Sequence, residues 1–536
     1  MEHSALHALL LTGLIVLLGG VLAQWWLIRP AARAVGVPWA DASPGGMERL
    51  VLAGALAATL ATGLDFFIQT AEIENRTVFG GIDLHLVWRF ATCTTVGQLD
   101  LARGALLLLA AATIRAPLPR GWRWALTGVF GFGALVAMAL VSHAAAQPAN
   151  RALFIAGQVV HLTAVAAWIG VLLHLFAARR QLLTPAAAPL LAEIVRRFSP
   201  FALVATSLLA LTGTFAAWRF LQTTGALVTS AYGLTLLVKL VLLAPAVAAG
   251  YVNFRDIRPA LLAGSGPLTP LLARFGRMLE LETTAGVLVI TVAGILGSVS
   301  PPGEDGSLLL TPQQTHAVLT PHWPTSHVDN WTLPEDPRGP TLDDLRYSEF
   351  THNWSGAAVT LMGLGWLMQT RGGRFGSAAA KVTPFLFVPF GAFIALAANP
   401  EVWLLHFVSP WEALTNPVIL EHQLGAVMVF LLAWLSWRDL KNPPALRPLG
   451  YAMPLVMIAG SLLLLGHAHS TPEISDALTN LVNAQHAVLG ACGLFAGTAR
   501  WFVLRGLAPA RWANVFWPAC VIALGLFMTF VYREVV

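Results

Sequence analysis

Apolar runs long enough to cross a lipid bilayer recur along all 536 residues of the chain, and they constrain the fold most strongly. About 20 apolar residues in a helix span the hydrocarbon core, where unpaired backbone groups are not tolerated. The sequence therefore predicts an all-α polytopic membrane protein with about 14 transmembrane helices. The predicted spans are 4–28, 48–70, 97–115, 123–142, 151–177, 198–220, 231–252, 277–298, 352–369, 383–399, 420–437, 451–467, 482–504 and 513–532.

The placement of charge predicts the orientation. Only 11 % of residues are charged, against about 25 % in soluble proteins. The short loops on one side of the predicted bundle are rich in Lys and Arg, as in Arg179, Arg180, Arg196 and Arg197. Because basic loops stay in the cytoplasm, we expect both termini in the periplasm of a bacterial inner membrane. The net charge of +5 then reflects contact with the bilayer, and no nucleic-acid partner is expected.

The chain divides into two predicted bundles. Residues 1–300 hold about eight spans, 301–350 form a periplasmic linker rich in proline and histidine, and 351–536 hold about six spans. The stretches "SHAAAQPANRALFIAGQVVHL" and "GHAHSTPEISDALTNLVNAQH" share one pattern: a helix that ends near a histidine, a polar hairpin, and a histidine early in the next helix. We interpret the bundles as related repeats, a common design of membrane carriers.

Histidines gather near the predicted periplasmic face. Of the fifteen, only His174 lies clearly toward the cytoplasm. Neutral imidazole is the commonest metal ligand in proteins, and polar groups inside a membrane usually serve a function, although interfacial capping is an alternative for any single histidine. The candidate metal ligands are His143, His161, His352, His422, His467, His469 and His486, with His3, His7, His316, His322 and His327 as accessory candidates. We expect His352, His422, His467 and His486 to converge at one depth.

Several charged residues lie inside predicted spans. Lys239 is expected to pair with Glu280 or Glu282 of the next helix, and Asp65 is expected to pair with Arg103. Structural salt bridges between helices and a gating or proton-coupling role both remain open for these residues.

Several segments resemble the CopD/PcoD copper-resistance membrane protein family over about residues 90–302. They are "TTVGQLDLAR", "SHAAA", "HLTAVAAWIGVLLHL", "RFSPFALVATSLLALTGTFAAWRF", "YGLTLLVKLVLLAPAVAAGYVNFR" and "LETTAGVLVITVAGILGSVSPP". Segments such as "EFTHNWSG" and "NAQHAVLG" resemble a domain joined to it in longer relatives. The resemblance implies copper movement across the inner membrane beside a periplasmic copper-binding partner of the CopC type. Ser142 precedes His143 where the family pattern has glycine.

The main functional hypothesis is a copper transporter rather than an enzyme, in which periplasm-facing histidines capture copper and pass it inward. Imidazole suits both copper oxidation states. The alternative is a b-type cytochrome or haem-handling protein, with the same histidines as axial ligands of haem b. A third hypothesis is a structural or assembly subunit of a respiratory complex. A cofactor assay on the purified protein discriminates between copper and haem.

Overall fold

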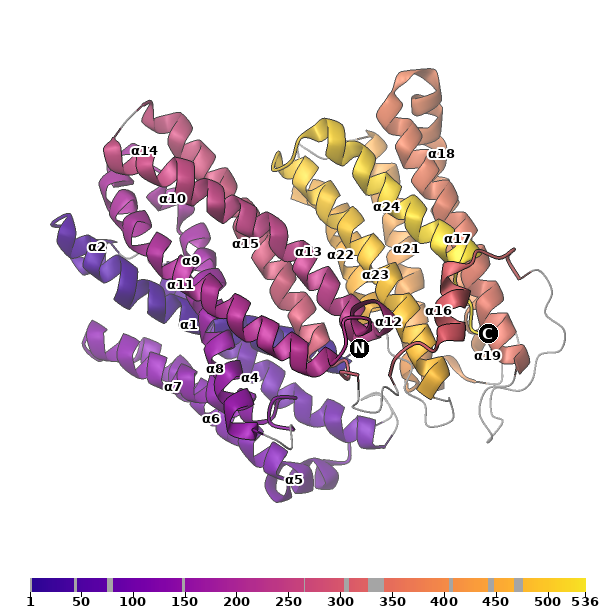
Figure 1. Ribbon diagram of the computed structural model, residues 1–536, viewed down its shortest axis with the longest axis horizontal. Coiled ribbons are helices and arrows are strands. Elements are labelled where there is room, and N and C mark those ends of the chain that lie inside the picture. The colour runs from indigo at the N-terminus through magenta and orange to yellow at the C-terminus, as the bar shows by residue number, and fades with distance from the viewer. Residues whose placement is uncertain are drawn as a thin grey trace.

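A computed structural model describes residues 2–42, 46–74, 81–146, 150–264, 266–302, 308–325, 342–403, 408–441, 448–466 and 476–536 (Figure 1). These residues form helices and turns, with no strand among them. Thirteen of the helices are long and apolar enough to cross a membrane. The predicted all-α polytopic class is therefore confirmed.

The N-terminal helices pack around α1. The long members are α1 (Glu2–Leu22), α4 (Gly46–Ile73), α6 (Thr95–Arg115), α7 (Arg120–Leu140), α8 (Arg151–Val165), α11 (Ala188–Leu221), α13 (Ala231–Val252) and α15 (Leu268–Leu296). Helix α1 contacts α4, α7 and α15. Small residues permit this central position: a Cβ at Gly19 would lie 2.3 Å from the Gly170 carbonyl carbon, and one at Gly13 would lie 2.5 Å from the Gly54 carbonyl oxygen.

Three of these helices continue through π-helical segments. Helix α1 runs through η1 (Ala23–Ile28) into α2 (Arg29–Ala34), α8 through η3 (Ala166–Gly170) into α9 (Val171–Ala177), and α13 through η5 (Asn253–Ile257) into α14 (Arg258–Ala263). A π-turn inserts an extra residue, which rotates the following side chains about the helix axis. The faces that α9 and α14 present to their neighbours therefore differ from those of uninterrupted α-helices.

The C-terminal helices form a second group. They are α17 (Leu342–Arg371), α18 (Gly373–Ala397), α21 (Pro417–Lys441), α22 (Ala452–Gly466), α23 (Asp476–Arg505) and α24 (Ala510–Phe530). Helix α17 contains the predicted span 352–369 but is not among the thirteen apolar helices. It packs closely along α24, where a Cβ at Gly525 would lie 2.4 Å from the Thr360 hydroxyl oxygen.

The remaining helices are short. They are α3 (Trp39–Ala42), α5 (Leu84–Cys93), α10 (Arg179–Leu182), η4 (Pro185–Ala187), α12 (Ala226–Thr229), α16 (Pro312–Leu319), α19 (Pro400–Trp403), α20 (Pro410–Ala413) and η7 (Pro448–Tyr451). Helix α16 lies within the predicted linker and begins with a capping box between Thr311 and Gln314. The linker is thus partly helical rather than a plain loop.

The two groups meet where α13 and α15 lie beside α22 and α23 (Figure 1). Val292 of α15, for example, belongs to the same buried apolar cluster as Leu465 of α22 and Leu494 of α23. The Arg505 guanidinium also donates a hydrogen bond to Glu280, which links α23 to α15. Apolar packing and one ion pair therefore join the groups, while the domain boundaries at 300 and 350 stay predictions.

The close approach of α1 to η3 gives a test of this packing. A Cβ at Gly19 has to displace the Gly170 backbone, so we expect Gly19→Ala to lower the free energy of unfolding by about 1–3 kcal/mol. The measurement is the thermal unfolding midpoint of the detergent-purified protein. Gly63→Ala is the matched control, because a Cβ at Gly63 meets nothing within 4 Å. Equal midpoints for the two variants would contradict the packing described.

Candidate metal-binding sites

One end of the helices carries the candidate ligands, and we call it the terminal face because α1 begins there and α24 ends there (Figure 1). The start of α1 lies beside the end of α22: a Cβ at Gly466 would lie 3.9 Å from Ser4. Three candidates, His327, His467 and His469, lie outside the described residues. The structure therefore places nine of the twelve candidate histidines.

His352 of α17 and His486 of α23 come together at this face. Their ring centroids are 5.6 Å apart, and the rings are nearly perpendicular. Tyr532 completes the group, stacked on His352 at 4.2 Å and lying 5.8 Å from His486. His486 is 2 % exposed and Tyr532 is fully buried. The predicted convergence of His352 and His486 is thus present in the structure.

Hydrogen bonds fix the protonation pattern of both rings. Nδ1 of His352 lies 2.8 Å from the Ser348 carbonyl oxygen, and Nδ1 of His486 lies 2.9 Å from that of Val482. A carbonyl oxygen only accepts hydrogen bonds, so each Nδ1 carries the proton. In the neutral ring Nε2 then holds the lone pair, which is the arrangement that metal-binding histidines adopt when a carbonyl orients them.

The C-terminal residues of the chain pack against this histidine pair. The Tyr532 hydroxyl donates to Glu534 Oε1 at 2.7 Å, and burial followed by the nearby Glu534 charge raises the pKa of Tyr532 well above its ordinary value. Glu349 accepts hydrogen bonds from the Glu534 backbone N–H at 3.0 Å and from the Thr325 hydroxyl at 2.7 Å. Sequence analysis missed Tyr532, Glu349 and Glu534, although the polar ending "YREVV" directly after the last span marks this segment.

A second histidine group surrounds the terminal-face end of α15. His3 and His7 have ring centroids 6.2 Å apart, and His3 Nδ1 lies 3.0 Å from Asp65 Oδ1. A Cβ at Gly297 would lie 3.0 Å from His7 Nε2, and the Gly297 carbonyl interacts with the His143 ring. Burial lowers the pKa of His143, which favours the neutral, ligating form. The accessory candidates His3 and His7 thus lie close to His143.

His161 lies apart from that group. Its Nδ1 is 2.8 Å from the Thr212 hydroxyl oxygen, whose own proton goes to the Leu208 carbonyl, so His161 Nδ1 donates and Nε2 holds the lone pair. His174, the deepest histidine, is fully buried, with Nε2 2.8 Å from the Val16 carbonyl and Nδ1 without a hydrogen-bond partner. His161 and His143, which share the repeated sequence pattern, therefore contact different groups.

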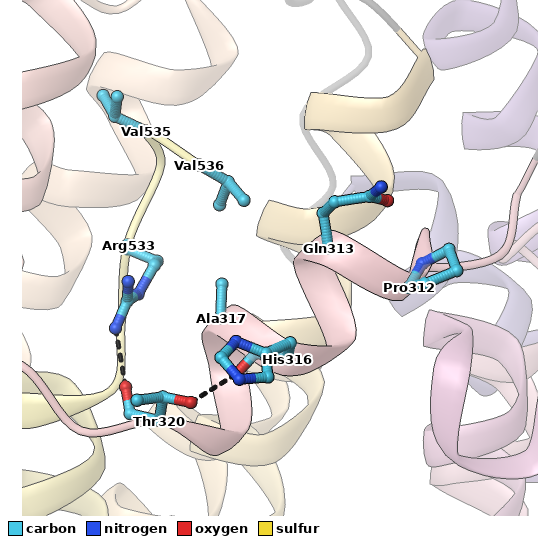
Figure 2. A pocket seen from close by; sticks show the side chains of 8 residues that line it. All are labelled: Pro312, Gln313, His316, Ala317, Thr320, Arg533, Val535 and Val536. Atoms are coloured by element: carbon cyan, nitrogen blue, oxygen red, sulfur yellow. Dashed lines mark hydrogen bonds between the residues drawn. The ribbon is translucent and has the colours of Figure 1, made fainter.

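Three further candidates take other positions. His422 is on α21, a helix that packs mainly on α18 and α22, so it is not grouped with the His352–His486 pair. Both His322 ring nitrogens face carbonyls, those of Trp323 at 2.7 Å and Tyr532 at 3.2 Å, so His322 ties the linker to the C-terminal residues instead of offering a ligand. His316 is exposed and lines a hollow of about 620 Å³ beside Arg533 (Figure 2).

The predicted salt bridges within spans need correction. Arg103 Nη1 pairs with Asp100 at 2.8 Å and its Nε donates to Thr62, whereas Asp65 pairs with His3 and lies within electrostatic range of Arg103. The i, i+3 spacing of Asp100 and Arg103 on one helix face was the signal that sequence analysis overlooked.

Among the described residues, Lys239 forms an ion pair with neither Glu280 nor Glu282. Glu280 pairs with Arg505. Glu282 faces the first bundle's interior, where Trp168 Nε1 donates to Oε1 at 2.8 Å and Asn253 Nδ2 donates to Oε2 at 3.2 Å. Both donors belong to π-helical segments, whose extra residue changes which side chains face inward. The hydropathy pattern of the sequence does not indicate this rotation of side chains about the helix axis.

No group of three or more His, Cys, Asp or Glu side chains in the described part of the chain has a metal-binding arrangement. The terminal face instead presents imidazoles in twos and threes, several with their basic nitrogen set by a hydrogen bond on the opposite side of the ring.

Comparison with known proteins points to copper. Residues 3–152 match the family model of the copper resistance protein D-like N-terminal domain, and residues 192–296 match that of copper resistance protein D. Copper transport protein CutJ of Bacillus subtilis (strain 168) is 28 % identical over 217 residues, which cover 39 % of this chain and 38 % of that protein. No solved structure matches the chain. The N-terminal half of the chain thus matches the models of the copper resistance protein D family.

Proposed function

We propose that the chain transports copper across the bacterial inner membrane and that the histidines of the terminal face capture the ion from the periplasm. Family membership supports copper as the substrate. The observation that carries the site assignment is the His352–His486 pair, because a backbone carbonyl holds the Nδ1 proton of each ring and leaves Nε2 as its basic nitrogen. The protein acts as a carrier, not as an enzyme.

In this proposal the two histidine groups offer copper two ways into the protein. His352 and His486 bind it at the second bundle, and His7 with His143 bind it at the first. The start of α1, which carries His3 and His7, lies beside the end of α22, so the two groups are neighbours. Deeper in the first bundle the described residues offer His161 and then His174, each with one ring nitrogen available as a ligand.

The orientation in the membrane and a partner complete the proposal. Basic residues such as Arg179, Arg371 and Arg438 lie at helix ends opposite the terminal face, which supports a cytoplasmic location for that end. A periplasmic copper-binding protein of the CopC type then docks on the terminal face. The hollow between α16 and the C-terminal residues, lined by His316, Thr320 and Arg533, supports such a contact (Figure 2).

The haem alternative and the respiratory-subunit alternative have no finding in their favour. The two family models and the related protein concern copper. We therefore retain copper as the substrate.

Removal of the C-terminal histidine pair tests the copper site. We expect His352→Ala combined with His486→Ala to lower Cu(I) affinity by about 100-fold. Loss of a residue that only orients a metal ligand lowers metal affinity by about 10- to 100-fold, and here two ligands are removed. The measurement is competition with a chromophoric Cu(I) chelator on detergent-purified protein. His85→Ala, which removes an exposed histidine of α5, is the control and should retain wild-type affinity. Equal affinities for all three proteins would remove this site from the proposal.

The first-bundle group predicts a pH dependence. Because burial lowers the pKa of His143, protons compete with copper at this residue only below 6.5, the ordinary imidazole value. In the His352→Ala, His486→Ala background we expect residual copper binding to be constant from alkaline pH down to that value and to fall in more acidic buffer. Adding His143→Ala should abolish this residual binding. A decline that begins well above the ordinary imidazole pKa would contradict the assignment.

An absorption spectrum separates copper from haem. The membrane-extracted protein, purified without added metal and then loaded with copper, should show no Soret band and should contain copper by elemental analysis. A Soret band that His352→Ala abolishes would establish the cytochrome alternative in place of the copper site.

A further inference from the structure

Glu282 lies in the middle of α15, with about 21 Å of helix on either side at 1.5 Å per residue. Its side chain is buried, and the residue is 3 % exposed. A carboxylate in this position is costly unless the protein supplies a cation, a proton or several hydrogen-bond donors. The identity of its partners therefore indicates which of these Glu282 uses.

The partners of Glu282 in the described part of the chain are both neutral. Trp168 Nε1 donates to one carboxyl oxygen and Asn253 Nδ2 to the other. No Lys, Arg or His lies within ion-pair distance of Glu282 among the described residues. Two neutral donors offset only part of the cost of burying a negative charge. The site therefore favours binding of a small cation to the carboxyl group.

The shape and chemistry of the site select a proton rather than copper. A Cβ at Gly250 would lie 3.1 Å from Glu282 Oε1, and one at Gly286 would lie 2.7 Å from an Ile169 methyl carbon, so the surroundings are closely packed. Copper prefers imidazole or sulfur ligands, and the neighbours here are an indole and an amide. A proton needs no additional space and no further ligand.

Asn253 is suited to both protonation states of the carboxyl group. In the arrangement described, its Nδ2 donates to a carboxyl oxygen, and its Oδ1 is buried without a hydrogen-bond partner. A half-turn of the amide exchanges these two atoms, because the amide group has nearly the same shape after rotation. The Oδ1 atom would then accept the hydrogen bond of a protonated carboxyl group. The same residue thus serves the ionised and the neutral form.

The two donors also lie on the segments of the bundle that can change register. Trp168 belongs to η3 and Asn253 to η5, and π-turns of this kind occur frequently at functional sites. A change in the charge of Glu282 therefore alters hydrogen bonds to two such turns.

Other titratable groups around Glu282 are few. The helices packed against α15 contribute His174 on α9, Tyr232, Lys239 and Tyr251 on α13, and Arg255, Asp256 and Arg258 at the opposite-face end. Helix α15 itself contributes Arg274, Arg277 and Glu280. Helix α1 carries no titratable residue between His7 and Arg29. Arg255 and Asp256 are exposed, and Glu280 is paired with Arg505. Glu282 is therefore the buried acid of α15 that no basic side chain neutralises.

Building on the proposed copper transport, we propose that Glu282 exchanges one proton for each copper ion that passes through the first bundle. As Cu(I) enters from the periplasm, the carboxylic acid dissociates and its proton leaves to the periplasm. As Cu(I) leaves to the cytoplasm, the carboxylate takes up a proton from the cytoplasm. The net charge of the low-dielectric interior then stays constant, which removes the cost of placing an uncompensated cation there. The exchange makes copper uptake electroneutral and dependent on the pH difference across the membrane.

Infrared spectroscopy tests proton binding without reference to copper. The detergent-purified protein should show the carbonyl stretch of a buried carboxylic acid, and Glu282→Gln should abolish that band. Glu280→Gln is the matched control, since Glu280 lies two residues away on the same helix and is held by Arg505. Glu282→Asp keeps a carboxylic acid at this position and should retain a carbonyl band. This variant serves as the test if Glu282→Gln is unstable. A band unchanged in Glu282→Gln would overturn the proposal.

Proteoliposomes test the coupling. Addition of Cu(I) should release protons, measured with a pH-sensitive dye, and Glu282→Gln should lose this release while Glu280→Gln retains it. Copper uptake with undiminished proton release in Glu282→Gln would overturn the exchange. If the wild-type protein takes up no copper, the proposed function and the exchange both fail, whereas the infrared result still decides whether Glu282 binds a proton.

Discussion

The absence of water inside a bilayer is the constraint on which this structure depends. Each polar side chain in a span has to find its partner within the protein, because the lipid offers none. Arg103 lies beside Asp100 and Thr62, His161 donates to Thr212, and Glu282 accepts from Trp168 and Asn253. These contacts tie α4 to α6, α8 to α11, and α15 to η3 and η5. The polar residues therefore fix how the helices of the first bundle are rotated against each other.

The spans themselves were predictable from the sequence, because about twenty consecutive apolar residues are typical of a membrane-spanning helix. Even α17, too polar for a simple hydropathy criterion, was predicted from its run at 352–369. The partners of charged residues were harder to predict. Lys239 and Glu282 lie on consecutive long helices, yet they do not pair. Glu280 pairs with Arg505, and Glu282 accepts a hydrogen bond from Trp168. Which face of a helix points inward depends on its packing and on π-turns, and neither leaves a periodic signal in the sequence.

The partners of the histidines were also hard to predict from the sequence. The predicted convergence of His352 and His486 is present in the structure, whereas His467, the predicted hairpin partner of His486, lies outside the described residues. Depth alone does not determine the direction in which a ring points. His143 therefore lies near Gly297 and His7, while His161 turns toward Thr212 on α11. The ligand role of either group stays a prediction, and the pairing of His322 with two carbonyls shows that a histidine on this face can be purely structural.

Under the proposed copper transport, the distribution of groups along the first bundle explains why the ion needs charge compensation. Candidate ligands are dense at the terminal face and sparse below it, where His161 and His174 are the histidines of the described spans. A cation that leaves the surface ligands enters a region with few groups to replace them, so its electrostatic cost rises steeply. Relays of closely spaced ligands lower this cost step by step. A single acid at mid-depth lowers it differently, because loss of its proton creates a negative charge at the moment when the cation arrives. The described part of the first bundle has the features of the second solution: few deep ligands, a buried carboxyl group at Glu282 with no basic partner, and neutral donors that accommodate both of its forms.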